Sequence, residues 1–289
     1  MGYSMPMPQG KQQYEPQTPL PPDYFPTEKS LDDDERLERM RRNCALDLPR
    51  LKIQNQAEKT PISVVCYGPS LVDTWQHITH PVMTCSGAHD FLIERGIVPN
   101  WHVEYDPRPH KAKFLQRPHP EVTYCISSAC APEVFSALRG HKVLMWHAAD
   151  EPIVNQIHAL VRKHDAQGGV ILGGGSNVGL RCLSVAYALG WRVFNVHALD
   201  CSYRGAQQWA GEHHGKPHYV MEIETYGRVF HTSDVMMNAA MDFKEITRIA
   251  LGCTFHLWGD GMLQHILKSE QAEAEEQQRI AAAARTAVV

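Results

Sequence analysis

Short apolar segments that alternate with helical segments constrain the fold of this chain more than any other feature. The apolar segments are rich in β-branched residues, and several stop at Gly, Ser or Asp, which is typical of strands buried on both faces of a sheet. We expect strands at 62–68, 82–87, 100–106, 122–128, 142–148 and 192–200. We expect helices at 90–97, 132–140, 151–164 and 176–190. This alternation predicts an α/β fold, a Rossmann-like, doubly wound and mostly parallel sheet with helices on both faces.

The two ends of the chain differ in composition from its middle. Residues 1–30 are rich in Pro and Gln and cannot bury enough apolar surface to offset the entropy of ordering, so we expect a flexible arm there. Residues 31–59 predict a lead-in helical segment, with Ser30 as its cap. The Rossmann-type domain is expected over 60–263. Residues 264–289 are rich in good helix formers and predict a C-terminal helical tail.

The charge balance and the apolar runs exclude several classes of protein. Lys and Arg number 28 and Asp and Glu number 32, a net charge of −4, so the chain is not expected to bind nucleic acid through bulk charge. No apolar run reaches the ~18 residues that a membrane span needs, and the first residues lack the apolar stretch of a signal peptide. Eight cysteines without a C-x-x-C pair indicate reduced thiols. We therefore expect a cytoplasmic protein without a membrane span, and the sequence leaves its oligomeric state open.

Two turns at the ends of predicted strands combine glycine with serine. Ligands of parallel sheets bind beyond the carboxyl ends of the strands, where Gly allows a close approach and Ser offers a hydroxyl group. The pattern fits a phosphate cradle, although an ordinary turn between a strand and a helix uses the same residues. The candidate nucleotide-binding residues are Gly68, Pro69, Ser70 and Leu71 in the first turn and Ser86 and Gly87 in the second.

A third predicted strand ends at Asp106, which is followed by Arg108, His110 and Lys111. A carboxylate at a strand end can hold Mg²⁺ or a ribose hydroxyl, and the cations after it can meet phosphates or an acidic substrate. The alternative is a loop stiffened by proline whose charges are solvated. Asp200 ends another predicted strand, so the two carboxylates would form an acidic pair at one edge of the sheet. Such pairs hold Mg²⁺ in phosphoryl transfer.

The segment 168–179 is a glycine-rich turn that leads into an apolar helix. It is not a Walker A loop, because the Lys and the Ser or Thr of that motif are missing after Gly179, and Val178 breaks the dinucleotide fingerprint. A glycine-rich helix start with polar residues remains, suited to a phosphate, a base edge or a sugar, with a purely structural turn as the alternative. Its candidate binding residues are Gly174, Gly175, Ser176 and Asn177.

Four segments in this order, VVCYGPSL, SGAHDFLIERGIVPNWHVEYDP, GGGSNVGLRCLSVAYALGWRVFNVHALDCSY and LWGDGML, resemble the 6-hydroxymethylpterin diphosphokinase MptE-like family over about residues 60–263. The resemblance implies a Rossmann-like core related to that of motility-accessory glycosyltransferases and sialyltransferases. It also implies transfer of diphosphate from ATP with Mg²⁺. By position, it assigns Gly68, Ser70 and Leu71 to the nucleotide turn, Ser86 and Gly87 to the second turn, and Asp106 and Asp200 to the acidic pair.

The leading hypothesis is a nucleotide-dependent transferase that moves a diphosphoryl group from ATP, or another nucleotide donor, to a small-molecule acceptor. In this hypothesis Asp106 and Asp200 hold Mg²⁺, while Arg108 and Lys111 offset the charge that develops on the phosphates. His102 or His110 would assist removal of a proton from the acceptor hydroxyl. Two alternatives remain, a glycosyltransferase that uses a nucleotide-activated sugar and a non-catalytic nucleotide-binding module that docks on an assembly.

Overall fold

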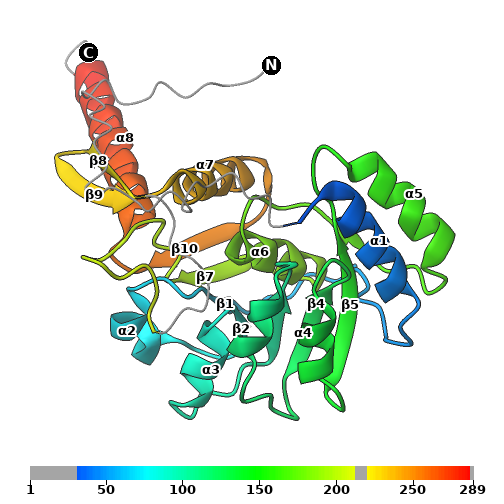
Figure 1. The fold of residues 1–289 in the computed structure, drawn as a ribbon. Helices are drawn as coiled ribbons and strands as arrows, with labels where there is room; N and C mark the ends of the chain where they lie inside the picture. The colour runs from blue at the N-terminus through cyan, green and yellow to red at the C-terminus, as the bar shows by residue number, and fades with distance from the viewer. Residues whose placement is uncertain (1–30, 212–219, 287–289) are drawn as a thin grey trace.

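The computed structural model describes residues 31–211 and 220–286 (Figure 1). The arm predicted for residues 1–30 lies outside the described residues. The first element is helix α1 (Asp33–Cys44), which lies within the predicted lead-in segment 31–59, and residues 45–59 contain no helix. Its N-cap is Asp32 and not Ser30, because the Asp32 carboxylate accepts a hydrogen bond from the Asp34 N–H at 2.9 Å.

The centre of the molecule is one parallel sheet of eight strands, as the sequence predicts. Each neighbouring pair of its strands runs parallel. In spatial order the strands are β10 (Thr254–Trp258), β7 (Val193–His197), β1 (Ile62–Val65), β2 (Val82–Cys85), β3 (Trp101–Glu104), β4 (Thr123–Ser127), β5 (Lys142–Ala148) and β6 (Ile171–Leu172). The α/β fold class and the parallel sheet are therefore confirmed.

The strand order decides which residues meet at the carboxyl edge of the sheet. Strands β7, β1, β2 and β3 are consecutive neighbours, although β7 lies far from the other three in sequence. Val65 pairs with both His197 and Thr84, so these strands end at the same level. The turns that follow them therefore converge at one edge, as expected for parallel strands.

Helices cover both faces of the sheet (Figure 1). On one face α6 (Val178–Ala188) and α7 (Asp234–Ile249) bury their apolar residues in the largest core cluster. On the other face lie the shorter helices α2 (Leu71–Thr74), η2 (Trp75–His77), α3 (Ala88–Ile93), η3 (Pro109–Phe114) and α4 (Pro132–Ala137). Helix α5 (Val154–His164) packs beside α1 through Met40, Ile157 and Val161. This three-layer arrangement leaves the carboxyl edge to turns and helix ends.

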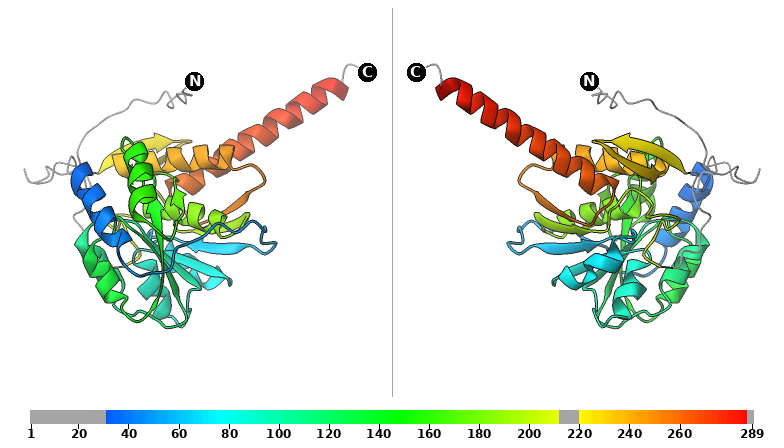
Figure 2. Two further views of the ribbon diagram at one scale, coloured as in Figure 1. Left: turned by 90° about the vertical axis from the view of Figure 1, so that its right-hand side faces the viewer. Right: turned by 90° about the vertical axis from the view of Figure 1, so that its left-hand side faces the viewer.

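No helix or strand was predicted between 201 and 261, where the described residues, 201–211 and 220–261, form four elements. They are the antiparallel hairpin of β8 (Met221–Thr225) and β9 (Arg228–Thr232), helix α7 and strand β10. The predicted C-terminal helix is α8 (Met262–Thr286), which projects away from the body of the molecule (Figure 2). Its residues 271–281 are all exposed.

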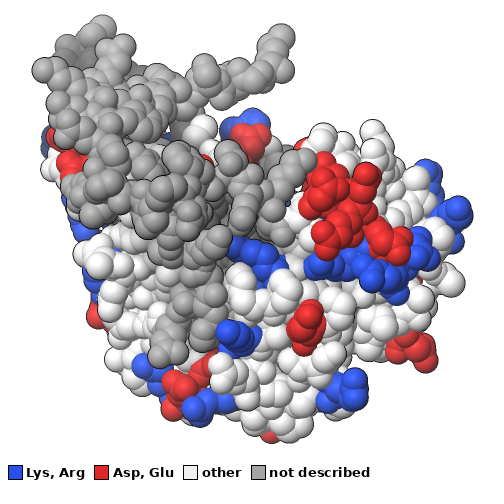
Figure 3. Space-filling view, in the orientation of Figure 1, with Lys and Arg blue, Asp and Glu red and all other residues white. Residues whose placement is uncertain are grey.

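The helices, the cysteines and the surface charges each bear on an expectation from the sequence. Within residues 31–211 and 220–286, no helix is long and apolar enough to cross a membrane. All eight cysteines are free thiols. On the face drawn in Figure 3, Lys and Arg side chains in the described region are interspersed with Asp and Glu.

Candidate functional site

A crevice of about 240 Å³ lies where β7, β1, β2 and β3 end, beside the N-terminus of α6. Loops after four neighbouring strands contribute to it, together with the start of α6 and one side of α7. Its charged lining residues are Asp106, Arg108, Lys111 and Asp200. The carboxyl-edge location expected for a ligand site in this fold is thus occupied by a concave, charged surface.

The first predicted turn, residues 68–71, holds a carboxylate of the protein itself. The Ser70 N–H donates to Asp200 Oδ2 at 2.8 Å, and the Ser70 hydroxyl donates to Asp200 Oδ1 at 2.5 Å. A Cβ on Gly68 would stand 2.5 Å from Asp200 Oδ2, so glycine is needed there for the close approach. Leu71 is fully buried in the core. Gly68 and Pro69 line the crevice, whereas both donors of Ser70 are taken by Asp200, so the structure corrects only the assignment of the Ser70 donors to a phosphate.

Asp200 is buried, with 3% of its surface exposed, yet it lines the crevice. Burial raises the pKa of this carboxyl above its ordinary value, and the two hydrogen bonds from Ser70 oppose the rise. A carboxylate that is desolvated but still reaches a cavity is suited to accept a proton from a bound group.

The second predicted turn contributes one of its two residues to the crevice. Ser86 lines it, with a positive φ of 47° that turns the chain from β2 into α3. Lys111 Nζ lies 3.5 Å from the Ser86 hydroxyl oxygen. A Cβ on Gly87 would overlap the ring of Tyr67, so Gly87 serves the packing of Tyr67.

The third strand end forms a compact cluster of charges. Arg108 donates from Nε to Asp106 Oδ1 and Oδ2 at 2.9 and 3.0 Å and also binds Oδ2 through Nη2. Lys111 Nζ lies 3.4 Å from Asp106 Oδ2, and Lys111 is only 5% exposed. Burial acts to raise the pKa of Asp106, but Lys111 and Arg108 outweigh it and hold this pKa well below its ordinary value. Asp106 is therefore ionised and positions two cations at the crevice.

Glu104 is a buried carboxyl beside this cluster that the sequence analysis did not single out. Its Oε1 accepts the N–H groups of Tyr105 and Asp106 at 2.9 and 3.1 Å. Burial raises the pKa of Glu104 to about 7, although Lys111 acts to lower it. The signal that could have revealed it is a glutamate at the last position of an otherwise apolar strand.

The two candidate histidines do not line the crevice. His102 is fully buried in β3, where its Nδ1 lies 3.1 Å from the Thr84 hydroxyl oxygen and its ring packs on His89. Burial lowers the pKa of His102 well below its ordinary value. His110 lies in η3 and is likewise not among the lining residues. The structure therefore corrects their assignment to proton removal, since neither is placed to meet a substrate there.

In the glycine-rich turn, Gly174 and Gly175 pack against α6, whereas Ser176 and Asn177 line the crevice. A Cβ on Gly174 or Gly175 would overlap Ser184 or Leu180 of α6, and both glycines have positive φ, so they serve a tight turn against this helix. Neither lines the crevice, which corrects their assignment to a ligand. The crevice does include Ser176 and Asn177. Asn177 is the N-cap of α6, because its Oδ1 accepts the Leu180 N–H at 2.9 Å.

Aromatic rings and thiols complete the lining. The rings are Tyr67, Tyr105 and Trp209, and the thiols are Cys66, Cys85 and Cys201. Flat apolar surfaces beside Lys111 and Arg108 suit a ligand that has both an aromatic ring and an anionic group. A nucleotide has both.

The carboxylates do not fit a Mg²⁺ ion shared between Asp106 and Asp200. Asp106 already faces two positive charges, and both oxygens of Asp200 accept hydrogen bonds from Ser70. Among the described residues, no group of three or more His, Cys, Asp or Glu side chains could hold a metal ion. In this structure Asp106 serves as the partner of two cations and Asp200 as the partner of Ser70.

Comparisons with known proteins agree with the fold. A family model described as 6-hydroxymethylpterin diphosphokinase MptE-like matches residues 36–206. A solved structure titled "Structure of MAf glycosyltransferase from Magnetospirillum magneticum AMB-1" superposes with a TM-score of 0.58 at 18% identity. The alignment covers 78% of this chain and 36% of that longer chain. A search of curated proteins gives no match. The four charged residues that line the crevice, Asp106, Arg108, Lys111 and Asp200, lie inside the matched stretch.

Proposed function

The chain belongs to the 6-hydroxymethylpterin diphosphokinase MptE-like family, and from this premise we propose that it is a nucleotide-dependent transferase whose donor binds in the crevice. Family membership supports a transferase. We propose more specifically that ATP, or another nucleoside triphosphate, gives a diphosphoryl group to the hydroxyl group of a small acceptor.

The observation that carries this proposal is the position of Lys111. Its ammonium group is held inside the crevice, 3.4 Å from Asp106 and 3.5 Å from Ser86. Both distances exceed those of ordinary hydrogen bonds, so phosphate oxygens can compete for this cation. A cation beside developing phosphate charge, in a site that excludes most water, stabilises the transition state of phosphoryl transfer.

The other groups of the crevice have complementary roles in this proposal. Arg108 adds a second cation, and Asp106 fixes both cations in place through the ion pairs described above. The start of α6 brings helix N–H groups that have no carbonyl partner within the helix, which favours anions. Tyr67, Tyr105 and Trp209 supply aromatic surface for the base. Mg²⁺ enters this proposal only as a companion of the nucleotide phosphates.

A glycosyltransferase is the second candidate, and one observation favours it. The fold superposes on that of a protein titled as a glycosyltransferase. In this second proposal a nucleotide-activated sugar binds in the crevice of the present chain. The two reactions differ in their products. Diphosphoryl transfer from ATP releases AMP, whereas glycosyl transfer releases the nucleotide of the sugar donor and leaves ATP intact.

Nucleotide binding tests the proposal directly. The melting temperature of the full-length protein should be measured with ATP, GTP, CTP and CMP, each with and without Mg²⁺. A ligand present at 100 times its dissociation constant adds about 2.7 kcal/mol to the free energy of unfolding, which corresponds to roughly 5–10 °C in melting temperature. No stabilisation by any nucleotide would contradict a donor site in the crevice and favour the non-catalytic module.

A pair of lysine variants locates the bound nucleotide. Lys111→Met keeps the buried aliphatic stem but removes the charge, so nucleotide affinity should fall at least tenfold. Lys113→Met, in the same short helix but exposed, is the matched control and should bind like the wild type. Equal affinity of the two variants would place the nucleotide elsewhere.

A further inference from the structure

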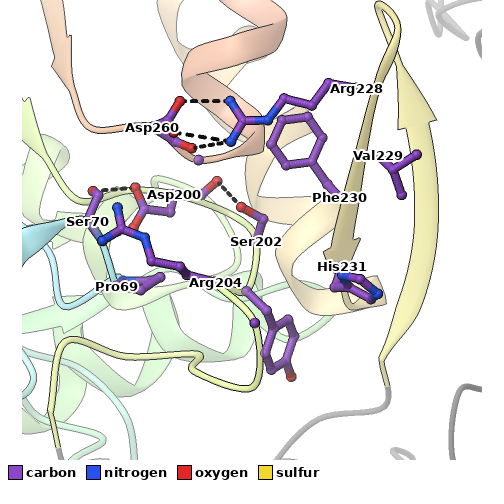
Figure 4. Close-up of a pocket in the computed structure, with 13 residues that line it drawn as sticks. Pro69, Ser70, Asp200, Ser202, Arg204, Arg228, Val229, Phe230, His231 and Asp260 are labelled. Atoms are coloured by element: carbon purple, nitrogen blue, oxygen red, sulfur yellow. Dashed lines mark hydrogen bonds and ion pairs between the residues drawn. The ribbon is translucent and has the colours of Figure 1, made fainter.

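A second cavity, of about 260 Å³, shares part of its lining with the crevice. Figure 4 shows the residues that line the second cavity. The two spaces share three lining residues, Pro69, Asp200 and Ser202. Asp200 therefore stands in the wall between them. A group bound in the second cavity and a nucleotide bound in the crevice would both have access to this carboxyl.

The far wall of the second cavity comes from β9 and from the loop after β10. Arg228 in β9 binds Asp260 of that loop through two nitrogens, at 2.7 and 3.1 Å. The loop lies directly on the first turn, because a Cβ on Gly259 would stand 2.5 Å from the Ser70 hydroxyl oxygen and 2.9 Å from Asp200 Oδ1. The hairpin is tied to the chain after β7 by the Tyr203 N–H, which donates to the His231 carbonyl at 2.7 Å. The walls of the cavity are thus held in place by hydrogen bonds and close packing.

The cavity is lined by two arginines and two aspartates, and Arg204 is the arginine whose ion-pair partner lies outside the lining. Arg228 is neutralised by its fork-like pair with Asp260. Arg204 reaches toward Ser70 and Asp200 in Figure 4, whereas its ion-pair partner Asp73 lies outside the cavity lining. That pair is solvent-exposed, at 42% and 61% of the two side chains, and such pairs contribute only about 0–1 kcal/mol. Breaking the ion pair between Arg204 and Asp73 therefore costs little free energy, so an anionic ligand can take the place of Asp73 beside Arg204.

We propose that the second cavity binds the acceptor, a small compound that carries both a hydroxyl group and an anionic carboxylate or phosphate group. Arg204 binds the anionic group, and the hydroxyl group lies at Asp200. This proposal rests on the proposed transferase function and adds to it the class of the acceptor and a base. The polar lining, which has Val229 and Phe230 as its apolar members beside Pro69, suits a compact polar molecule better than a flat ring.

In the proposed reaction Asp200 accepts the proton of the acceptor hydroxyl group while the diphosphoryl group is transferred. The acceptor hydroxyl oxygen forms a bond to the β-phosphorus of ATP, and the bond from that phosphorus to the oxygen that bridges the α-phosphate breaks. AMP leaves with the bridging oxygen. The hydroxyl proton passes to the Asp200 carboxylate, which burial makes a stronger base than an exposed aspartate. Ser70 holds Asp200 in place for this transfer through its two hydrogen bonds.

Three probes of similar size test the acceptor class on the full-length protein. Glycerate carries hydroxyl groups and a carboxylate, glycerol 3-phosphate carries hydroxyl groups and a phosphate, and glycerol is neutral. Calorimetric titration should show binding of at least one anionic probe and at least tenfold weaker binding of glycerol. The tighter of the two anions identifies the anionic group. Failure of both anions to bind, or equal binding of glycerol, would overturn the proposal.

Variants separate this proposal from the donor site. Arg204→Met should weaken the anionic probe at least tenfold and leave nucleotide affinity within about twofold of the wild type. Lys111→Met should do the reverse. Arg248→Met, which removes an arginine of another exposed ion pair on α7, is the matched control and should change neither affinity. If Arg204→Met binds the probe like the wild type, the acceptor proposal is wrong while the donor site stands. If the wild type binds the probe but no nucleotide, the proposed function fails instead.

Discussion

Replacing Gly261 by alanine tests whether the loop after β10 fixes the position of Asp200. A Cβ at Gly261 would lie under 3.0 Å from the Cα, Cβ and carbonyl oxygen of Asp200, and two of these three atoms belong to the backbone. Rotation of a side chain cannot relieve this overlap, so the loop or the end of β7 must move. Gly261 does not have a positive φ, so the conformation of the residue adds no strain of its own.

The size of the effect follows from two opposing contributions. Overpacking costs about 1–3 kcal/mol, and a Gly→Ala change at a compatible conformation returns about 0.4–1 kcal/mol by restricting the unfolded chain. We expect a net loss of about 1.3 kcal/mol, which lowers the melting temperature by roughly 3–5 °C. The proposed transferase activity should fall by more than the loss of folded protein explains, because Asp200 is displaced from the wall between the two cavities.

Urea denaturation measures the stability change, and Gly173→Ala is the matched control. A Cβ at Gly173 would meet no atom within 4 Å, and its φ is not positive, so this variant should be neutral or slightly more stable. If Gly261→Ala is as stable as Gly173→Ala and keeps full activity, the contact between the loop and Asp200 does not position the carboxyl.

Three further predictions concern Glu104, Asn177 and α8. Because burial raises the pKa of Glu104 to about 7, its stability contribution is fully present below its ordinary value of 4.5 and is lost as the pH rises through 7. As the pH rises from about 4.5 to 8, the free energy of unfolding of Glu104→Gln should therefore increase by about 3 kcal/mol relative to that of the wild type. Urea denaturation at several pH values measures this difference, and a difference that stays constant over the range would contradict the buried carboxyl. Asn177→Ala removes the N-cap of α6 and should cost about 1 kcal/mol in urea denaturation; no loss would mean that the cap bond is replaced by water. Ending the chain after residue 270 removes only exposed residues among the described part of α8 and should leave the melting temperature within about 2 °C of the full-length value, whereas a larger drop would show that this segment packs on something.

The sheet could be predicted from sequence because buried parallel strands must be apolar on both faces. Strands β1 to β5 and β7 each contain such a run, and the structure confirms them. The hairpin of β8 and β9 was missed for a physical reason. Its strands are partly exposed, and its turn is Tyr226–Gly227, where a tyrosine takes a positive φ of 47° that is normally associated with Asn, Asp or Gly. Strand β10 lies at the edge of the sheet and alternates in exposure, so it lacks the continuous apolar run.

The sequence predicted a candidate site at the carboxyl edge of the sheet, where the structure has a crevice, but the pairing of the polar residues within it could not be read from the sequence. Ser70 and Asp200 are 130 residues apart, and only the strand order shows that β1 and β7 are neighbours. The pair of Asp106 with Arg108 is local, yet spacing alone does not distinguish an ion pair from two ligand-binding groups. A polar residue at the sheet edge can bind a ligand or pair with another residue of the protein. Which of the two it does depends on the neighbours that the fold places beside it.

The walls of the second cavity come from two separate stretches of the chain, and this division affects how such proteins can diverge. Every charged group of the crevice lies within residues 36–206, whereas Arg228, His231 and Asp260 come from later in the chain. Mutations in the later stretch can reshape one enclosure while the cations and carboxylates of the other are inherited unchanged. If the second cavity is the acceptor site proposed above, homologues that share the matched stretch can differ in their acceptors, and exchanging the hairpin between two of them should change acceptor selectivity.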